Sequence, residues 1–466
     1  MRFTIFASLV SLLFSGCMAN LANSIGVDLS NTLEQEKRFI AGDYAEAAAL
    51  AVENKDKNSE LDVSNLLSML NAGNNYLYAK DYENSIKMLD ESEAIIKFQH
   101  ERILALNAGD YAAQLLLNDA AVDYKASITE AVMVNTYKSL DYMALKKLDK
   151  ARVELNRAVD RQRRAKETYA KLIGKQKEAI AQKRREKNPT VFDKTLNNPQ
   201  VKSIAQRNYS SLRQFEAYPD FINPFTTYLA GLFFAIDGDY SKSSSLLKEA
   251  HGMMPENKTL ESDFEMVEKA LLGRGIQEKY VWVIYENGLS PVKHEYKIDI
   301  PMYLVSQKIN YIGIALPKMY TRSRATYDMS ILSHGKLLDK TSTVADMDRV
   351  ILTEFKYSYD DILTRAIFSA MLKTYTQYEA KKENGYLGLA TTVFHLLTTR
   401  ADVRLWKSLP KDFQVARVLM PSDAKLLLKA GEHNIDIELD KNAKHSIVYV
   451  RIPTAISKPS FSIINF

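Results

Sequence analysis

Proline is distributed unevenly along the 466-residue chain, and this distribution constrains the fold more than any other feature. None of the 12 prolines precedes Pro189, and seven of them follow residue 275. Because proline interrupts helices and central strands, a long stretch without it favours helices. The 17 glycines are also fewer than a turn-rich all-β chain of this length would carry. The sequence therefore predicts an α+β protein with a helical N-terminal part and a mixed C-terminal part.

The first residues have the pattern of a bacterial lipoprotein signal. An apolar run over residues 3–14 follows a basic start and precedes Gly16-Cys17, which contains the only cysteine of the chain. A run of this length is too short to span a bilayer, so it is typical of a cleaved signal. We expect residues 1–16 to be removed and Cys17 to be lipidated, and Met18 fits sorting to the outer membrane, facing the periplasm. The alternative is a hydrophobic N-terminus with a chance cysteine.

Basic residues are concentrated in one stretch. Residues 146–187 hold 16 Lys/Arg and 6 Asp/Glu, whereas the formal charge of the whole chain is only +5. This stretch is predicted to be a long helix that projects from its neighbours. Its charges fit a solvated helix face, and the alternatives are contact with anionic lipid, nucleic acid or an acidic partner. The mild overall charge and the expected periplasmic location argue against nucleic acid.

Residues 17–275 contain helix pairs with the spacing of tetratricopeptide repeats, in which small residues let two helices cross and large residues fill the gap. The best match consists of Gly231, Phe234, Gly238, Tyr240, Ala250 and Pro255. A second consists of Gly73, Tyr76 and Tyr82, and residues 142–158 and 42–47 give partial matches. The sequence thus predicts a tetratricopeptide-like solenoid, with residues 188–222 as a polar connection. Generic helical hairpins are the alternative.

Residues 276–466 read as a separate α+β domain with a mainly antiparallel sheet. Runs rich in β-branched and aromatic residues predict strands at residues 280–285, 296–300, 311–316, 413–419, 435–439 and 446–452. Apolar spacing predicts a helix that begins near residue 346 and a second, buried one over residues 385–397.

Three segments resemble an uncharacterised family of bacterial tetratricopeptide-containing envelope lipoproteins. They are residues 401–410 together with residues 414–417, residues 132–142, and the stretch from Glu286-Asn287-Gly288 through Pro291 and Pro301. Val403 departs from this family, which usually has a small polar residue there. Members are commonly encoded near lipoproteins that resemble activators of peptidoglycan synthases, so the resemblance implies an envelope location and this architecture more than it implies a chemistry.

The sequence offers no recognisable catalytic set, so we expect no enzyme activity, no cofactor and no bound metal. None of the seven histidines forms an i,i+4 pair, and there is no Gly-x-Ser-x-Gly turn or nucleotide-binding glycine loop. Asp346 and Asp348 could hold a metal or phosphate, but two acids at the start of a helix more often satisfy its amide groups.

Asp402, Arg404 and Trp406 form the most unusual cluster, because they combine a charged couple with one of only two tryptophans. We interpret them as partner-binding candidates, and the alternative is a buried ion pair and aromatic ring that fix a loop. Two functions stay open. The first is a lipid-anchored scaffold that binds protein partners in cell-envelope assembly through the concave face of the repeats and the C-terminal loops. The second is an envelope enzyme or small-ligand-binding protein that uses the C-terminal domain.

Overall fold

The computed structural model describes residues 32–53, 63–107, 123–186, 198–199, 203, 218, 222–301, 311–383 and 400–466. Three expectations therefore lie outside the described residues: the signal with Cys17, most of the polar connection, and the helix over residues 385–397.

The N-terminal part is helical, and its described helices include four hairpins. The first hairpin pairs residues 32–41 with α2, the second pairs α3 with α4, the third α6 with α7, and the fourth α10 with α11. The bounds are α2 (Tyr44–Glu53), a short turn η1 (Val63–Asn65), α3 (Leu66–Tyr78), α4 (Tyr82–Ala105), α6 (Ile128–Ala144), α7 (Leu148–Glu186), α10 (Pro224–Ile236), α11 (Tyr240–Met253), α12 (Lys258–Lys269) and η5 (Ala270–Arg274).

All four hairpins turn in the same way. A residue with positive φ comes just after the first helix of each hairpin, and these residues are Gly42 (84°), Lys80 (66°), Lys146 (57°) and Gly238 (85°). The amide of each bonds the carbonyl three residues earlier, and the next amide bonds the carbonyl five residues before itself. This pattern is the Schellman motif, which satisfies the last carbonyl groups of a helix. Asp81 and Asp239 then cap the second helices of hairpins two and four.

In the second and fourth hairpins, the two helices also cross at equivalent positions. A Cβ atom on Gly73 would lie 2.6 Å from Leu89 Cδ2, and one on Gly231 would lie 2.8 Å from Leu247 Cδ2. Only glycine leaves room for leucine at this distance. Ala250 is buried on α11, and Pro255 lies in the turn before α12. Tyr76 and Phe234 lie in the last turn of the first helices, and Tyr82 and Tyr240 begin the second helices.

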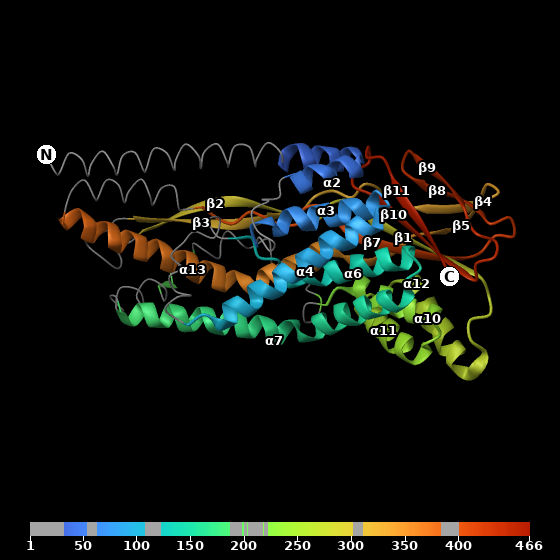
Figure 1. Cartoon of the computed structure of the whole chain (residues 1–466), viewed down its shortest axis with the longest axis horizontal. Helices are drawn as coiled ribbons and strands as arrows, with labels where there is room; N and C mark the ends of the chain where they lie inside the picture. Colours follow the sequence, from blue (N-terminus) through green and yellow to red (C-terminus); the bar gives the residue numbers. More distant parts are fainter. Residues whose placement is uncertain are drawn as a thin grey trace.

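The long basic helix is confirmed as α7, whose 39 residues extend well beyond its partner α6. In Figure 1, α7 reaches toward the same end of the molecule as α13 (Met347–Glu383) and the β2–β3 hairpin (Val292–Pro301 and Tyr311–Tyr320). These elements share a second apolar cluster that contains Ile180, Ile314 and Phe355. The helix therefore packs against other elements along its far half, and the expectation that it projects from its neighbours is wrong.

The C-terminal part is rich in sheet, which confirms the α+β class. Within the described residues a five-stranded sheet has the order β11-β10-β1-β7-β6, and a four-stranded sheet has the order β5-β4-β8-β9. The five-stranded sheet is mixed, because β1 pairs with β10 in parallel and its other pairs are antiparallel. The bounds are β1 (Tyr280–Asn287), β4 (Ser330–Ser333), β5 (Lys336–Lys340), β6 (Ser342–Asp346), β7 (Asp412–Leu419), β8 (Lys425–Ala430), β9 (His433–Glu438), β10 (His445–Ile452) and β11 (Ser460–Asn465).

The five-stranded sheet is buried on both faces. Val281 and Val283 of β1 belong to an apolar cluster shared with the four-stranded sheet, whereas Trp282 and Ile284 belong to a cluster shared with the helical hairpins. Strand residues alternate between faces, so one strand contributes to both layers. The expected boundary after residue 275 is thus a change from helices to strands, and the packing continues across it.

The first helices of the second, third and fourth hairpins lie inside and their second helices lie outside. Almost every residue of α6 and α10 is buried, and these helices contact β11 and β6 respectively. By contrast, α4, α7 and α11 each have an exposed side. The face that the sequence led us to expect as an open groove is therefore covered by the chain's own sheet, because the apolar residues of β1 and β10 need a second layer.

Candidate functional site

The candidate site lies at the end of β1, where the sequence Glu286-Asn287-Gly288 follows an apolar run. Because strand residues alternate, Glu286 points to the helical hairpins and Asn287 points to the opposite face. Gly288 has φ of 69°, and a Cβ atom there would lie 2.8 Å from the carbonyl oxygen of Ser323. Glycine is therefore required for the loop after β3 to cross at this point.

Glu286 joins the sheet to the third hairpin. Its Oε1 accepts a hydrogen bond of 2.7 Å from the hydroxyl of Tyr137 on α6. Arg451, its register partner on β10, lies with Nε 3.9 Å from Glu286 Oε2, and both side chains are fully buried. Burial raises the pKa of the Glu286 carboxyl, and Arg451 and Tyr137 offset part of that rise. A paired, buried carboxylate of this kind fixes the relative position of the elements that it joins.

Arg451 extends this joint to further elements. Its guanidinium donates to the carbonyl oxygens of Gly288 at 2.7 Å and Ser408 at 3.2 Å. It also lies over the ring of Phe39 in the first hairpin, 5.4 Å from the centroid. One buried cation thus contacts β1, the 401–410 loop and the N-terminal hairpin.

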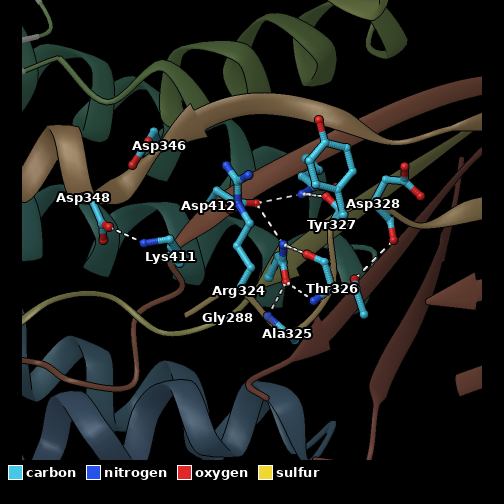
Figure 2. Close-up of polar contacts among 12 residues, drawn as sticks. Gly288, Arg324, Ala325, Thr326, Tyr327, Asp328, Asp346, Asp348, Lys411 and Asp412 are labelled. Atoms are coloured by element: carbon cyan, nitrogen blue, oxygen red, sulfur yellow. Dashed lines mark hydrogen bonds and ion pairs between the residues drawn. The ribbon is translucent and has the colours of Figure 1, made fainter. Parts of the chain in front are cut away.

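On the opposite face, Asn287 and Asp412 hold the loop after β3 (Figure 2). The side-chain oxygen of Asn287 accepts from the amides of Ala325 at 3.0 Å and Thr326 at 3.2 Å, and its amide donates to Asp412 Oδ1 at 3.2 Å. Asp412 also accepts from Gln414 at 2.9 Å and from Nε of Arg324. We call Asn287, Arg324, Asp412 and Gln414 the Asp412 cluster. It makes the loop rigid.

This rigid loop presents an aromatic ring to solvent. Tyr327 is 82% exposed, although Gln414 donates to its carbonyl oxygen at 3.0 Å. The Arg324 side chain, 35% exposed, contacts the buried Asp412 through Nε. Figure 2 shows both residues on the loop beside Asp412. An exposed tyrosine beside an arginine on a fixed loop is the combination in which binding energy concentrates at protein interfaces.

Asp346 and Asp348 lie at the start of α13 and make polar contacts there. Asp346 Oδ1 accepts from the amide of Arg349 at 3.2 Å, which caps the helix, and Asp348 forms an ion pair with Lys411. Burial raises the pKa of Asp348 to about 6, although Lys411 opposes this rise. Asp346 therefore satisfies an amide group at the start of the helix, as the alternative to a metal or phosphate site predicts. Asp348 instead connects the helix to the segment before β7.

The predicted cluster of Asp402, Arg404 and Trp406 divides between surface and core. Arg404 and Asp402 form a two-pronged ion pair at 2.9 Å that is partly exposed. Trp406 is fully buried, its ring is 5.7 Å from Tyr137, and its amide donates to Glu130 Oε1 at 2.8 Å. Trp406 offers no surface to a partner, so the loop-fixing alternative is the one that this geometry favours.

The three segments that carry the family resemblance meet at this joint. Tyr137 lies in residues 132–142, Glu286 begins the Glu286-Asn287-Gly288 stretch and Trp406 lies in residues 401–410, and Tyr137 contacts both of the others. No model of a protein family matches the chain, and no curated protein matches it. The similarity to envelope lipoproteins therefore remains a resemblance. In the structure, all three segments contribute to the contact between the sheet and the helical hairpins.

Sequence reasoning missed Arg451, Arg324 and the exposure of Tyr327. A signal for Arg451 was present, because β1 and β10 are apolar strands that each carry one charge near the C-terminal end, at Glu286 and Arg451. Opposite charges in two apolar strands indicate that the strands pair. Arg324 and Tyr327 lie in a loop without periodicity, which gave no such signal.

The polar contacts of this site are of the kind that holds secondary-structure elements together. The described residues include no group of three His, Cys, Asp or Glu side chains placed to hold a metal ion. The carboxylates of Glu286 and Asp412 accept hydrogen bonds from fixed donors, and Asp263 on α12 accepts from Tyr228, Trp282 and Arg417 in the same manner. Contacts of this kind position helices on a sheet.

Proposed function

We propose that the protein is a lipid-anchored scaffold of the outer membrane, facing the periplasm, that binds protein partners in cell-envelope assembly. The observation that carries this proposal is the series of hairpins with one turn geometry and, in two of them, one glycine crossing. This repetition supports a tetratricopeptide-like solenoid, a class of structure that presents extended surfaces to other polypeptides. The signal pattern that ends at Cys17 supports the anchor.

The proposal assigns the partner to outward surfaces, since the inner face of the hairpins is covered by the sheet. The exposed side of α7 is a weak candidate, because Arg164 pairs with Asp160, Lys171 with Glu167, and Arg161 with Glu93. These pairs reduce the attraction of the basic helix for phosphate groups. The loop with Tyr327 and Arg324 is the better candidate, because it is exposed and rigid.

The lipid at Cys17 is proposed as the membrane attachment. Among the described residues, every helix falls short of the length or the apolar character needed to cross a bilayer. Several acyl chains on one cysteine would give stable anchoring. Replacement of Cys17 by Ser should release the protein from the membrane fraction or leave the signal uncleaved. Unchanged membrane association, with no acyl label on the wild-type protein, would contradict the anchor.

Partner binding is tested with tagged, lipidated protein that is cross-linked in membranes and recovered. Tyr327→Ala should reduce partner recovery about tenfold or more, because it removes the exposed ring, and should leave the melting temperature unchanged. Tyr357→Ala is the matched control, because Tyr357 is an exposed tyrosine on α13, far from the loop in sequence. Equal recovery with both variants would remove the loop from the proposal, and recovery of no partner by the wild type would remove the scaffold.

A further inference from the structure

The dipeptide Asn287-Gly288 at the end of β1 is a sequence in which asparagine is chemically unstable. A bond forms between the backbone nitrogen of Gly288 and Asn287 Cγ, and Nδ2 leaves as ammonia with the proton of the attacking amide. Water then opens the resulting succinimide ring to give aspartate or isoaspartate. Glycine favours this reaction because no side chain hinders the approach of its nitrogen. The local sequence therefore makes Asn287 a site of deamidation unless the fold prevents it.

The sheet holds the nitrogen that would attack. The amide of Gly288 donates to the carbonyl oxygen of Ile452 on β10 at 3.0 Å. The carbonyl oxygen of Asn287 accepts from the amide of Lys411 at 2.9 Å, and Asn287 is in register with strand residues on both sides. The reaction requires rotation of this backbone segment to bring the nitrogen to Cγ, and these hydrogen bonds resist that rotation.

The Asp412 cluster and its neighbours hold the side chain that would be attacked. Asn287 is fully buried. Its Oδ1 accepts from the hydroxyl of Tyr285 at 2.9 Å, in addition to the two loop amides described above. Its Nδ2, the leaving group, donates to the carbonyl oxygen of Thr326 at 2.9 Å and to Asp412 Oδ1 at 3.2 Å. Both ends of the amide are therefore fixed by groups that surround it.

The product of deamidation does not fit these surroundings. The reaction replaces Nδ2, which donates, with a carboxylate oxygen, which only accepts. This oxygen would face two acceptors, the carbonyl oxygen of Thr326 and the carboxylate of Asp412. Asp412 is itself fully buried and already pairs with Arg324, so two buried carboxylates would lie beside that cation. Facing acceptors and like charges in a buried site oppose closure of the structure around the product.

We propose that Asn287-Gly288 is a latent deamidation site, which β10 and the Asp412 cluster keep closed in the folded protein, and that its reaction makes opening of this region irreversible. A β1 end that recloses before the reaction returns to the native structure. One that reacts first carries aspartate or isoaspartate at position 287. Isoaspartate also lengthens the backbone by one carbon where Gly288 passes close to Ser323. The inference does not depend on the proposed function, because the chemistry needs only water.

Peptide mapping by mass spectrometry tests whether the fold closes the site. The full chain is incubated folded and in urea, in the same mildly alkaline buffer, and deamidation of Asn287 is followed with time. Asn384-Gly385 also follows a glutamate, so in urea it is an internal standard for the unfolded reaction. The two sites should react at similar rates in urea, and folding should slow the reaction of Asn287 about a hundredfold or more. Equal rates at Asn287 in the folded and unfolded protein would overturn the inference.

Two matched variants separate the Asp412 cluster from general stability. Asp412→Ala removes an acceptor of Asn287 Nδ2, whereas Asp263→Ala removes an equally buried acid on α12. Asp412→Ala should deamidate at Asn287 about tenfold faster than Asp263→Ala in the folded protein. Equal rates would mean that the cluster does not close the site. If either variant does not fold, Gln414→Ala removes one donor to Asp412 and should speed the reaction about threefold over the wild type, and no increase would overturn the inference.

The effect of the product is tested with Asn287→Asp. This variant should prevent folding or lower the urea midpoint by about 0.5 M or more, because the new carboxylate faces Thr326 and Asp412. Asn434→Asp makes the same change at an exposed position of β9 and should leave the midpoint unchanged. Equal midpoints for the two variants would show that the folded protein accommodates the product and would overturn the irreversible step.

Discussion

The helices α6 and α7 form one hairpin, and both carry charged residues, but the surroundings of these residues are opposite. Lys138 of α6 is 1% exposed and contacts Asp90 at 2.7 Å, Glu93 at 2.8 Å and Glu154 at 3.1 Å. Arg164 of α7 is 68% exposed and pairs with Asp160. The inner helix meets the sheet on one side and other helices on the rest, whereas the outer helix meets solvent. A charged residue in this protein is therefore not necessarily exposed.

The largest expected effect separates these two cations. Lys138→Ala leaves three carboxylates around a buried position without their common partner and should lower the free energy of unfolding by about 3–5 kcal/mol. Arg164→Ala, which removes a charge of the same sign from the outer helix, should change it by less than about 0.5 kcal/mol. Urea unfolding of both variants measures the difference, and similar values would remove the distinction between inner and outer helices.

The pH dependence of a half-buried acid, Glu93, and a buried acid, Asp348, sharpens the comparison. Lys138 and Asn135 contribute to lowering the pKa of Glu93 to about 2, against the opposing effect of burial, while burial raises the pKa of Asp348 to about 6. The Glu93 contribution to stability is present above pH 4.5 and is lost as pH falls toward 2. The Asp348 contribution has the opposite sign, because the folded protein holds its proton more tightly than the unfolded chain, so stability falls as pH rises toward 6.

The substitution Asp348→Asn removes the pH dependence of stability that comes from the Asp348 carboxyl. The stability of the variant relative to the wild type should be more favourable at about pH 7 than at about pH 4, by up to about 3 kcal/mol. Urea unfolding at the two pH values gives this difference, in which the titration of the other acids cancels. A constant difference between variant and wild type would show that Asp348 titrates normally.

A smaller effect on stability is expected from substitutions on the two sides of α11. Ala250 is fully buried near the crossing of α10 and α11, and Lys248 is on the exposed side of the same helix. Ala250→Leu should overpack the crossing and lower stability by about 1–3 kcal/mol, whereas Lys248→Ala should be close to neutral. Thermal melts that rank the two substitutions the other way would show that the helix faces are assigned wrongly.

Local elements of the fold were predictable from the sequence. The strands at 280–285 and 446–452 and the long helix after residue 146 follow from local composition and spacing, and the structure has β1, β10 and α7 there. The repeated turn was also visible, since Gly42-Asp43 and Gly238-Asp239 have the same order. Patterns of this kind depend on neighbouring residues, which one sequence contains in full.

The arrangement of these elements was not predictable in the same way. The parallel pairing of β1 with β10 joins Glu286 to Arg451, which are far apart in sequence, and the sequence predicted only a mainly antiparallel sheet without its strand pairs. Trp406 was a candidate contact because tryptophan and arginine concentrate at interfaces, but the same residue types also fill cores. Burial depends on which layer covers a face, and nothing in a single helix pair reveals that a sheet will cover it.

The central claim is that the helical hairpins and the sheet form one cooperative structure. The only two tryptophans, Trp282 and Trp406, are fully buried where the helices meet the sheet, so their fluorescence reports this contact. Urea unfolding of the mature protein can be followed by this fluorescence and by far-ultraviolet circular dichroism, which reports the helices. The account predicts coincident transitions with one midpoint. Loss of the helical signal in a separate transition, with tryptophan fluorescence still native, would contradict it.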